Sequence, residues 1–217
     1  MKELSMVGAG THTPKRRTRI QRANEKKILE AALEVFSQNG FRGSTIDQIA
    51  EEAGMSKPNL LYYFKSKQDI HETLLSRLLD SWLAPLRELS EDGDPLEEIL
   101  NYVRRKIEMA RDFPRESRLF ANEIVQGAPR IKPILEGEIN NLVLEKSKIM
   151  DKWMDEGRIK KVDARHLIFS IWATTQHYAD FEVQVKVVMG QGIDDPAQFE
   201  TTKAYLEQLF TSLLKAD

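Results

Sequence analysis

The sequence contains no cysteine and only four histidines among its 217 residues. Disulfide bonds and thiolate metal sites are therefore excluded, and this absence is typical of proteins from a reducing compartment. The histidines, at positions 12, 71, 166 and 177, do not combine with nearby acids at a spacing that predicts a metal site or a general base. Glycine-rich phosphate loops and a Gly-x-Ser-x-Gly elbow are also missing. We expect no metal and no cofactor, and an enzyme is only a remote alternative.

Long apolar runs are absent as well. No stretch approaches the roughly 18 to 20 apolar residues that span a membrane. Residues 1–14, MKELSMVGAGTHTP, lack the apolar segment of a signal peptide. We therefore expect a cytoplasmic protein without membrane association. The chain is still long enough, with 41% hydrophobic residues, to form a small N-terminal domain and a larger helical one.

Charge is unevenly distributed along the chain. Residues 1–70 carry 12 basic and 8 acidic side chains, whereas residues 71–217 carry 20 basic and 26 acidic ones. Between Lys15 and Lys27, seven basic residues stand against the single acid Glu25. Such a run suits the phosphate backbone of DNA, although a solvated surface run has the same composition. We predict that residues 1–19 form a disordered basic arm.

Residues 44–64, STIDQIAEEAGMSKPNLLYYF, have the pattern of two short helices joined by a turn. Thr45 and Gln48 have the spacing of a capping box at the start of the first helix. Gly54 suits the left-handed position that follows a helix, and Ser56 is a favourable N-cap for the second helix. This arrangement predicts a helix-turn-helix, although an ordinary helical hairpin would share several of these signals.

The second of these helices has two different faces. Leu60, Leu61 and Phe64 are expected to face the core. Donor groups and aromatic rings lie on the other side, near the N-terminal end of the helix, which is the part that a helix-turn-helix inserts into the major groove. These residues are Lys57, Asn59, Tyr62 and Tyr63.

The segment from Ile28 to Ile70 resembles the N-terminal DNA-binding domain of the TetR family. It reads ILEAALEVFSQNGFRGSTIDQIAEEAGMSKPNLLYYFKSKQDI and has the family's order of alanine, glycine, threonine and Tyr-Phe positions. The resemblance implies a DNA-binding domain over residues 20–68 and a homodimer on a pseudo-palindromic double-stranded operator. It also implies phosphate contacts by Thr45, Tyr63 and Lys67, and base contacts by Lys57, Pro58, Asn59 and Tyr62. Pro58 replaces the usual glycine, and Leu61 stands where many members have tyrosine.

The rest of the chain has helical periodicity and no alternating strand pattern, so the protein is predicted to be all-α. Pro85 is expected to bend or end the first long helix near Trp82. Caps, prolines and glycines predict helices over residues 66–89, 95–112, 114–126, 134–156, 164–189 and 197–214. Residues 69–217 would form a ligand-binding and dimerisation domain.

The predicted helix 164–189 contains the most apolar stretch of the chain, in the segment LIFSIWATTQHYADF, and we expect this stretch to be buried on every side. Trp172 and Gln176 are four residues apart and share a face. An indole ring beside a carboxamide could hold a flat molecule by stacking and paired hydrogen bonds. A core glutamine beside a packing tryptophan explains this motif about equally well.

Several segments of the predicted ligand-binding domain look like the pyrimidine-utilisation regulators within the same family. They are SWLAPL at 81–86, SRLF at 117–120, GAP at 127–129 and the 167–181 segment. This resemblance implies a repressor that binds uracil or thymine through Trp172 and Gln176, with Trp82, Phe120 and Glu123 as secondary candidates. The alternative within the family is a repressor of an efflux pump, with a broad hydrophobic pocket.

The last two predicted helices are apolar enough to form a dimer interface. We expect them to form a four-helix bundle with the same helices of a second protomer. The residues predicted to face the partner are Phe181, Val185, Val188, Leu206 and Phe210.

Overall fold

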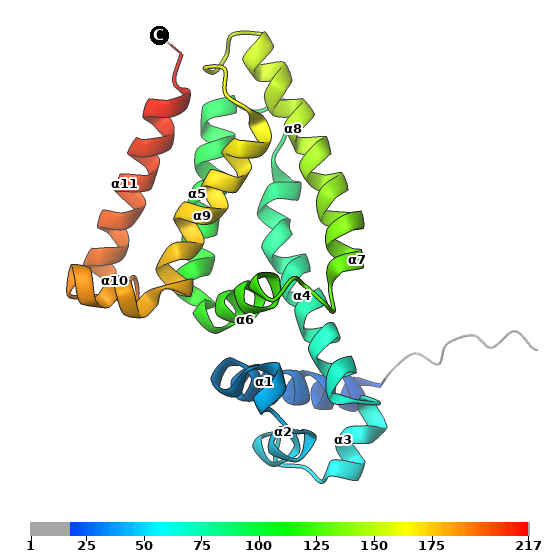
Figure 1. The fold of residues 1–217 in the computed structure, drawn as a ribbon. Helices are drawn as coiled ribbons and strands as arrows, with labels where there is room; N and C mark the ends of the chain where they lie inside the picture. The colour runs from blue at the N-terminus through cyan, green and yellow to red at the C-terminus, as the bar shows by residue number, and fades with distance from the viewer. Residues whose placement is uncertain (1–17, 217) are drawn as a thin grey trace, which may run out of the picture.

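The computed structural model describes residues 18–216, and all its regular elements are helices (Figure 1). A small N-terminal bundle contains α1 (Arg19–Gly43), α2 (Ile46–Glu52) and α3 (Lys57–Tyr63). Helix α4 (Lys67–Glu88) leaves this bundle and enters the larger C-terminal one. The C-terminal bundle also contains α5 (Pro95–Asp112), α6 (Pro114–Val125), α7 (Lys132–Ile134), the π-helix η1 (Leu135–Ile139), α8 (Asn140–Asp155), α9 (Ala164–Asp180), α10 (Glu182–Met189) and α11 (Pro196–Leu214).

Local sequence signals start and end these helices as expected. Thr45 and Gln48 form a capping box at the start of α2, and the backbone N–H of Asn59 donates to Ser56 Oγ at the start of α3. Gly54 has φ +59°, a left-handed conformation that glycine adopts without a steric penalty. The side chain of Asp163 accepts from the first backbone N–H groups of α9. The turn between α2 and α3 is therefore encoded locally.

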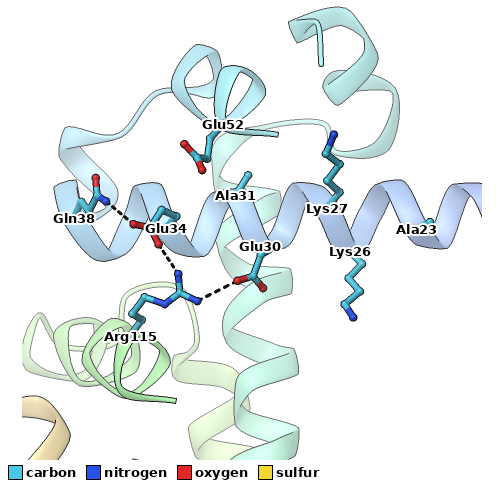
Figure 2. A pocket seen from close by; sticks show the side chains of 9 residues that line it. All are labelled: Ala23, Lys26, Lys27, Glu30, Ala31, Glu34, Gln38, Glu52 and Arg115. Atoms are coloured by element: carbon cyan, nitrogen blue, oxygen red, sulfur yellow. Dashed lines mark hydrogen bonds and ion pairs between the residues drawn. The ribbon is translucent and has the colours of Figure 1, made fainter. Parts of the chain in front are cut away.

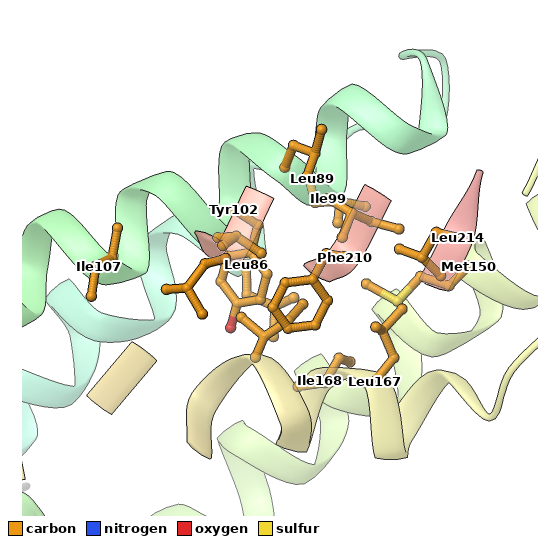
Figure 3. Close-up of a cluster of buried hydrophobic side chains, with 14 of the residues drawn as sticks. Leu86, Leu89, Ile99, Tyr102, Ile107, Met150, Leu167, Ile168, Phe210 and Leu214 are labelled. Carbon is orange, nitrogen blue, oxygen red and sulfur yellow. The ribbon is translucent and has the colours of Figure 1, made fainter. Parts of the chain in front are cut away.

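Each bundle has its own hydrophobic core. The N-terminal core is built from α1 to α4 and also receives Leu119 of α6 and Ala128 of the following loop. The C-terminal core lies between α4, α5, α8, α9 and α11 (Figure 3). Phe210 and Trp153 are almost completely buried there. Because α6 contributes to the N-terminal core as well, the two bundles are packed against each other.

Several predicted helix boundaries differ from the structure. Helix α4 continues through Pro85 to Glu88, close to the predicted end at residue 89, so only the expectation that Pro85 ends it near Trp82 is wrong; Leu83 and Leu86 on either side of the proline are packed into the core. Of the predicted arm 1–19, Arg19 already belongs to α1 and Thr18 is its N-cap. Residues 1–17 lie outside the described part of the chain. The expected helix 134–156 begins earlier, with α7, and includes η1.

The predicted helix 164–189 is divided in two at Phe181, which has the non-helical angles φ −115° and ψ 34°. Contacts from α6 hold this break. Arg118 donates to the carbonyl oxygen of Ala179 at 3.2 Å and to the carboxylate of Glu182 at 2.7 Å. Arg118 therefore bridges the end of α9 and the start of α10, a tertiary contact that the periodicity of the sequence does not reveal.

His71 of α4 is buried between Phe36 and Phe41, with ring centroids 4.8 and 4.9 Å away. Its Nδ1 atom has no hydrogen-bond partner among the described residues. Burial, together with the positive charges of Arg130 and Lys67, lowers the pKa of His71 to about 4. The ring is therefore neutral at pH 7. Its protonation at low pH is unfavourable, because the positive charge would be buried beside two other cations.

This burial predicts that stability falls at acidic pH. The pKa of His71 is lower in the folded protein than in the unfolded chain, so its contribution is complete above pH 6.5 and is lost between pH 6.5 and pH 4. The loss should reach about 3 kcal/mol at most, since one pKa unit corresponds to about 1.4 kcal/mol. Thermal unfolding of His71→Leu between pH 7 and 4.5 should show a smaller decrease than the unmodified protein. His166→Ala, at an exposed position, is the control and should behave like the unmodified protein.

Candidate DNA-contact surface and ligand cavity

Helix α3 presents a polar and aromatic surface to solvent. Lys57, Pro58, Asn59 and Tyr62 are all exposed, and 71% of Tyr62 is accessible. Thr45, at the start of α2, is exposed too. We call these five residues the contact surface. They combine hydrogen-bonding groups and an aromatic ring near the N-terminal end of a short helix, which is how a helix-turn-helix presents side chains to base edges.

Hydrogen bonds orient the side chains around this surface. Asn24 of α1 donates to Tyr63 Oη at 2.7 Å, and the Tyr63 ring packs edge-on against Tyr62. Lys57 Nζ lies 2.9 Å from the carboxylate of Asp47 on α2. Both members of this ion pair are well exposed, so it contributes little to stability and can open when a phosphate competes for the lysine.

The structure corrects the prediction for Leu61. Leu60 and Phe64 face the core as expected, but 38% of Leu61 is exposed. Leu60 and Phe64 are four residues apart and lie on one face, whereas Leu61 is turned about 100° from Leu60. Leu61 therefore lies one turn after Lys57, at the edge of the contact surface.

Lys67, which is predicted to contact phosphate, also makes contacts within the protein that the sequence did not predict. Its Nζ donates to the carbonyl oxygens of Phe41 at 2.7 Å and Ser44 at 2.6 Å, and it lies 4.4 Å from the centroid of the Phe41 ring. Burial is the main reason that the pKa of Lys67 is lowered. The ammonium group therefore satisfies backbone carbonyls at the end of α1 and links α4 to α1.

Two lysine variants separate these roles. Lys67→Met should destabilise the protein by about 2 kcal/mol, because the carbonyls lose charge-assisted hydrogen bonds, and should leave the salt dependence of DNA binding unchanged. Lys57→Met should do the opposite, with little loss of stability and a slope of log K against log salt that is smaller by about 0.9 per lost phosphate contact. Thermal unfolding and a salt titration of operator binding measure both effects. A smaller salt dependence of operator binding in Lys67→Met would show that Lys67 contacts a phosphate.

The C-terminal bundle contains a cavity of about 620 Å³ between α6, η1 and α9. Trp172, Gln176 and Asp180 line it from α9, where they follow one another at intervals of four residues and therefore form a stripe along one face of the helix. Apolar side chains of α6 and η1 form much of the remaining wall. They are Phe120, Ala121, Ile124, Val125, Leu135 and Ile139.

The polar groups of the stripe differ in whether they already have hydrogen-bond partners within the protein. Trp172 Nε1 donates to Tyr102 Oη at 2.5 Å, so the indole ring is held in place and its N–H is occupied. The carboxamide of Gln176 makes no hydrogen bond to any residue within 18–216. Thr175 is buried and donates to the carbonyl oxygen of Ile171 at 2.7 Å. The Gln176 carboxamide thus has its full hydrogen-bonding capacity left for a ligand.

The segment around Trp172 is not buried on every side, contrary to expectation. Ile168, Ile171 and Ala179 face the core, but Phe169 is 52% exposed and Ala173 is exposed as well. The segment therefore has a core face, a cavity face and an outer face. The apolar outer face is what made the sequence look fully buried.

Of the three secondary ligand-binding candidates, the structure places only one at the cavity. Phe120 lines the cavity, but Trp82 and Glu123 do not. Trp82 is buried, with Lys106 Nζ 4.2 Å from its ring centroid. Glu123 is buried on the other side of α6, where it accepts from the backbone N–H of Arg130 at 2.9 Å and forms an ion pair with its guanidinium at 2.8 Å.

The sequence interpretation missed two charged residues of the cavity, Arg118 and Asp180. Asp180 could have been found, because it continues the spacing of Trp172 and Gln176 by one more turn. Arg118 comes from another helix, and no local pattern connects it to α9. No cluster of three or more possible metal ligands occurs in residues 18–216. No helix in the same range has the length and apolar character needed to cross a bilayer.

Only part of the predicted dimer interface is available for contact. Phe181 and Val188 are exposed, but Val185, Leu206 and Phe210 are buried inside the protomer. The buried residues lie on the inner faces of α10 and α11, so the apolar surface is on neighbouring faces of these helices. We call the exposed apolar residues of α10 and α11 the outer stripe: Val183, Val187, Val188, Met189, Tyr205, Leu209 and Leu213.

Comparison with known proteins identifies both halves of the chain. Residues 28–74 match the family model described as "Bacterial regulatory proteins, tetR family", and residues 75–217 match the model described as "YcdC-like protein, C-terminal region". The chain is 45% identical over 204 residues to the HTH-type transcriptional regulator RutR of Escherichia coli strain K12, covering 94% of this chain and 96% of that protein.

Solved structures share the fold at lower sequence identity. A putative fatty acid metabolism regulator of Clostridium perfringens superposes with a TM-score of 0.65 at 21% identity, covering 85% of this chain and 96% of that one. A TetR-like transcriptional regulator from Rhodococcus sp. RHA1 gives a TM-score of 0.65 at 19% identity, with 90% and 96% covered. These structures support the arrangement of helices.

Proposed function

The chain belongs to the TetR family of DNA-binding transcriptional regulators, and from this premise we propose that it is a homodimeric repressor controlling pyrimidine utilisation, released from its operator by uracil or thymine. Its family consists of regulators rather than enzymes, and small-molecule effectors are typical of it. The observation that carries the proposal is the cavity stripe of Trp172 and Gln176, in which a fixed aromatic ring adjoins a carboxamide without a partner.

The chemistry of uracil and thymine fits this stripe. Both are flat rings with adjacent carbonyl acceptors and N–H donors. A carboxamide can donate to such a carbonyl and accept from the neighbouring N–H in the same plane. The Trp172 ring offers a flat apolar wall for stacking. The likeness to RutR over nearly the whole chain supports the same ligand class.

We propose that each protomer places the contact surface of α3 in one half of a pseudo-palindromic operator. The exposed Lys57, Asn59 and Tyr62 would read or contact the groove, while Thr45 and Tyr63 would bind phosphates. Two half-sites require two protomers at a fixed spacing. The effector would act by favouring a dimer in which this spacing is wrong, which requires unequal affinity for the two arrangements.

Helix α6 is the element best placed to pass the signal on. Phe120 and Ile124 line the cavity, whereas Leu119 and Glu123, on the other side of the same helix, pack toward the N-terminal bundle. Arg115 at its start forms ion pairs with Glu30 and Glu34 of α1 (Figure 2). Helix α4 is a second candidate for this role, since it leaves the DNA-binding domain and enters the C-terminal bundle. The contacts of α6 favour a path that uses both helices.

Gln176→Leu tests the proposal directly. This variant keeps the size of the side chain and removes its hydrogen-bonding groups, so the fold, the dimer and operator binding should be retained. Uracil affinity should fall about 10-fold to 100-fold, because the carbonyl and N–H of the ligand would face an apolar group. Calorimetry with uracil, followed by operator binding with and without uracil, measures both consequences.

Gln198→Leu serves as the control, since Gln198 is another helical glutamine that lies away from the cavity, near Met189 and Thr202. It should bind uracil normally. Undiminished uracil binding by Gln176→Leu would mean that the pocket lies elsewhere. A panel of purines and cationic dyes separates the pyrimidine repressor from the efflux-pump repressor, since only the latter should bind the dyes.

A further inference from the structure

Asp180 is the charged end of the cavity stripe, and its surroundings are unusual for a surface carboxylate. It lines the cavity one turn beyond Gln176. Ser117 Oγ of α6 donates to Asp180 Oδ1 at 2.5 Å. Within residues 18–216 the second carboxylate oxygen, Oδ2, accepts no hydrogen bond. An acceptor with remaining capacity is therefore held at a fixed position beside the carboxamide.

Two basic side chains interact with this carboxylate, the buried Lys106 and Arg118, which itself lines the cavity. Lys106 of α5 is 97% buried, with its Nζ above the ring of Trp82, and it interacts electrostatically with Asp180. Arg118 interacts with Asp180 as well, although its hydrogen bonds go to Ala179 and Glu182. A buried ammonium is costly without a nearby negative charge. Burial lowers the pKa of Lys106 to about 7 and raises the pKa of Asp180, and the attraction between the two opposite charges opposes both shifts. Lys106 therefore favours the carboxylate form of Asp180, whose Oδ2 atom still has capacity for a hydrogen bond.

A ligand that uses Asp180 Oδ2 must supply a hydrogen-bond donor, and this requirement limits the class of ligand. An N–H group donating to a carboxylate makes a hydrogen bond roughly twice as strong as one between neutral groups. A ligand carboxylate or phosphate would be repelled by the Asp180 carboxylate, and Arg118, which also lines the cavity, is already paired with Glu182. A ring with N–H groups next to carbonyls could use the Gln176 carboxamide and the Asp180 carboxylate together, because the two side chains are on successive turns.

We propose that Asp180 accepts a hydrogen bond from a ring N–H of the effector and thereby selects cyclic amides and imides that carry a free N–H. This inference rests on the proposed function and assigns a second specificity-determining residue to the same cavity. Ser117 positions the carboxylate, and Lys106 is a positioning residue that favours its charged form. The Trp172 ring, held by Tyr102, supplies the stacking wall.

The test compares two changes of carboxylate to carboxamide that are close together in the fold. Asp180→Asn keeps the shape and the acceptor for Ser117 but weakens the acceptor offered to the ligand. We expect its uracil dissociation constant, measured by calorimetry, to rise at least about fivefold. Glu182→Gln is the matched control, because Glu182 pairs with Arg118 and Lys186 and does not line the cavity. It should change uracil affinity less than about twofold.

The N-methylated uracils identify the donor. The unmodified protein should bind one of the two ligands, 1-methyluracil or 3-methyluracil, at least about fivefold more weakly than the other, because methylation removes the N–H that donates to Asp180. The difference in affinity between the two ligands should be smaller in Asp180→Asn. Asp and Asn have the same size, so any steric effect of the methyl group is the same in both proteins and the change reports the hydrogen bond. Uracil affinity of Asp180→Asn within twofold of normal, or an equal loss in both variants, would overturn the inference and leave the proposed function intact. Absence of uracil binding by the unmodified protein would overturn both.

Discussion

Leu209→Asp should convert the protein to a monomer and reduce its operator affinity by about 100-fold or more. Leu209 lies in the outer stripe between Tyr205 and Leu213, which follow the same face of α11. A carboxylate there would be buried without a partner if two protomers paired through this stripe. A monomer can engage only one half-site and loses the gain in effective concentration from the second, which is typically 10² to 10⁴. Sedimentation and operator titration measure the two effects.

Two further variants make this result interpretable. Ala204→Asp introduces the same charge on α11 at an exposed position away from the outer stripe, and it should leave the dimer intact. Tyr205→Asp, at a position that is 57% exposed, should reproduce the monomer without disturbing the protomer core. Charge at Val185 would be uninformative, because Val185 is buried and its replacement would unfold the protomer. A Leu209→Asp dimer that still binds DNA would refute the proposed interface.

Glu123→Ala should lower the melting temperature by roughly 6 to 12 °C and weaken the effect of uracil on DNA binding. Glu123 and Arg130 form the buried ion pair behind α6, and the Arg130 guanidinium lies 3.6 Å from the centroid of the Phe41 ring in α1. Removal of Glu123 leaves Arg130 unpaired at a largely buried site, which costs about 3 kcal/mol. For a chain of this size, one kcal/mol corresponds to roughly 2 to 4 °C.

Arg115→Ala is the matched control, because it breaks an ion pair between the same two helices at a more exposed position (Figure 2). It should cost less than about 1 kcal/mol. Thermal unfolding of both variants, and the ratio of operator affinities with and without uracil, give the comparison. Equal destabilisation by the two changes would show that burial of the Glu123 pair has no special importance for the contact between the bundles.

The helices and their caps could be predicted because their signals are local. Thr45 with Gln48, Ser56, Gly54 and Asp163 act within a few residues, and each has its expected place in the structure. The all-α class and the family were predicted correctly for the same reason. Interruptions caused by other helices, such as the break at Phe181 held by Arg118, could not be read from a single segment.

Side-chain roles were harder to predict wherever two faces of a helix are both apolar. Leu206 and Leu209 have the same chemistry, but one is buried in the protomer and the other belongs to the outer stripe. Lys67 shows the same problem for charge, since its carbonyl partners in the α1–α2 segment are more than twenty residues away in the chain. Helical spacing placed Trp172 and Gln176 on one face, and the resemblance to pyrimidine-utilisation regulators favoured a ligand-binding role for them; Asp180 continues the same spacing.

The two faces of α6 also have a consequence for protein engineering. A substitution on its cavity face, at Phe120 or Ile124, would alter ligand fit and at the same time shift the face that packs on the DNA-binding bundle. Gln176 on α9 is different, because its carboxamide makes no hydrogen bond within residues 18–216, whereas Asp180 is linked to α6 through Ser117. A biosensor with a new effector should therefore be built by changing Gln176 first, with α6 and its contact to Asp180 left intact so that effector binding still changes the affinity for DNA.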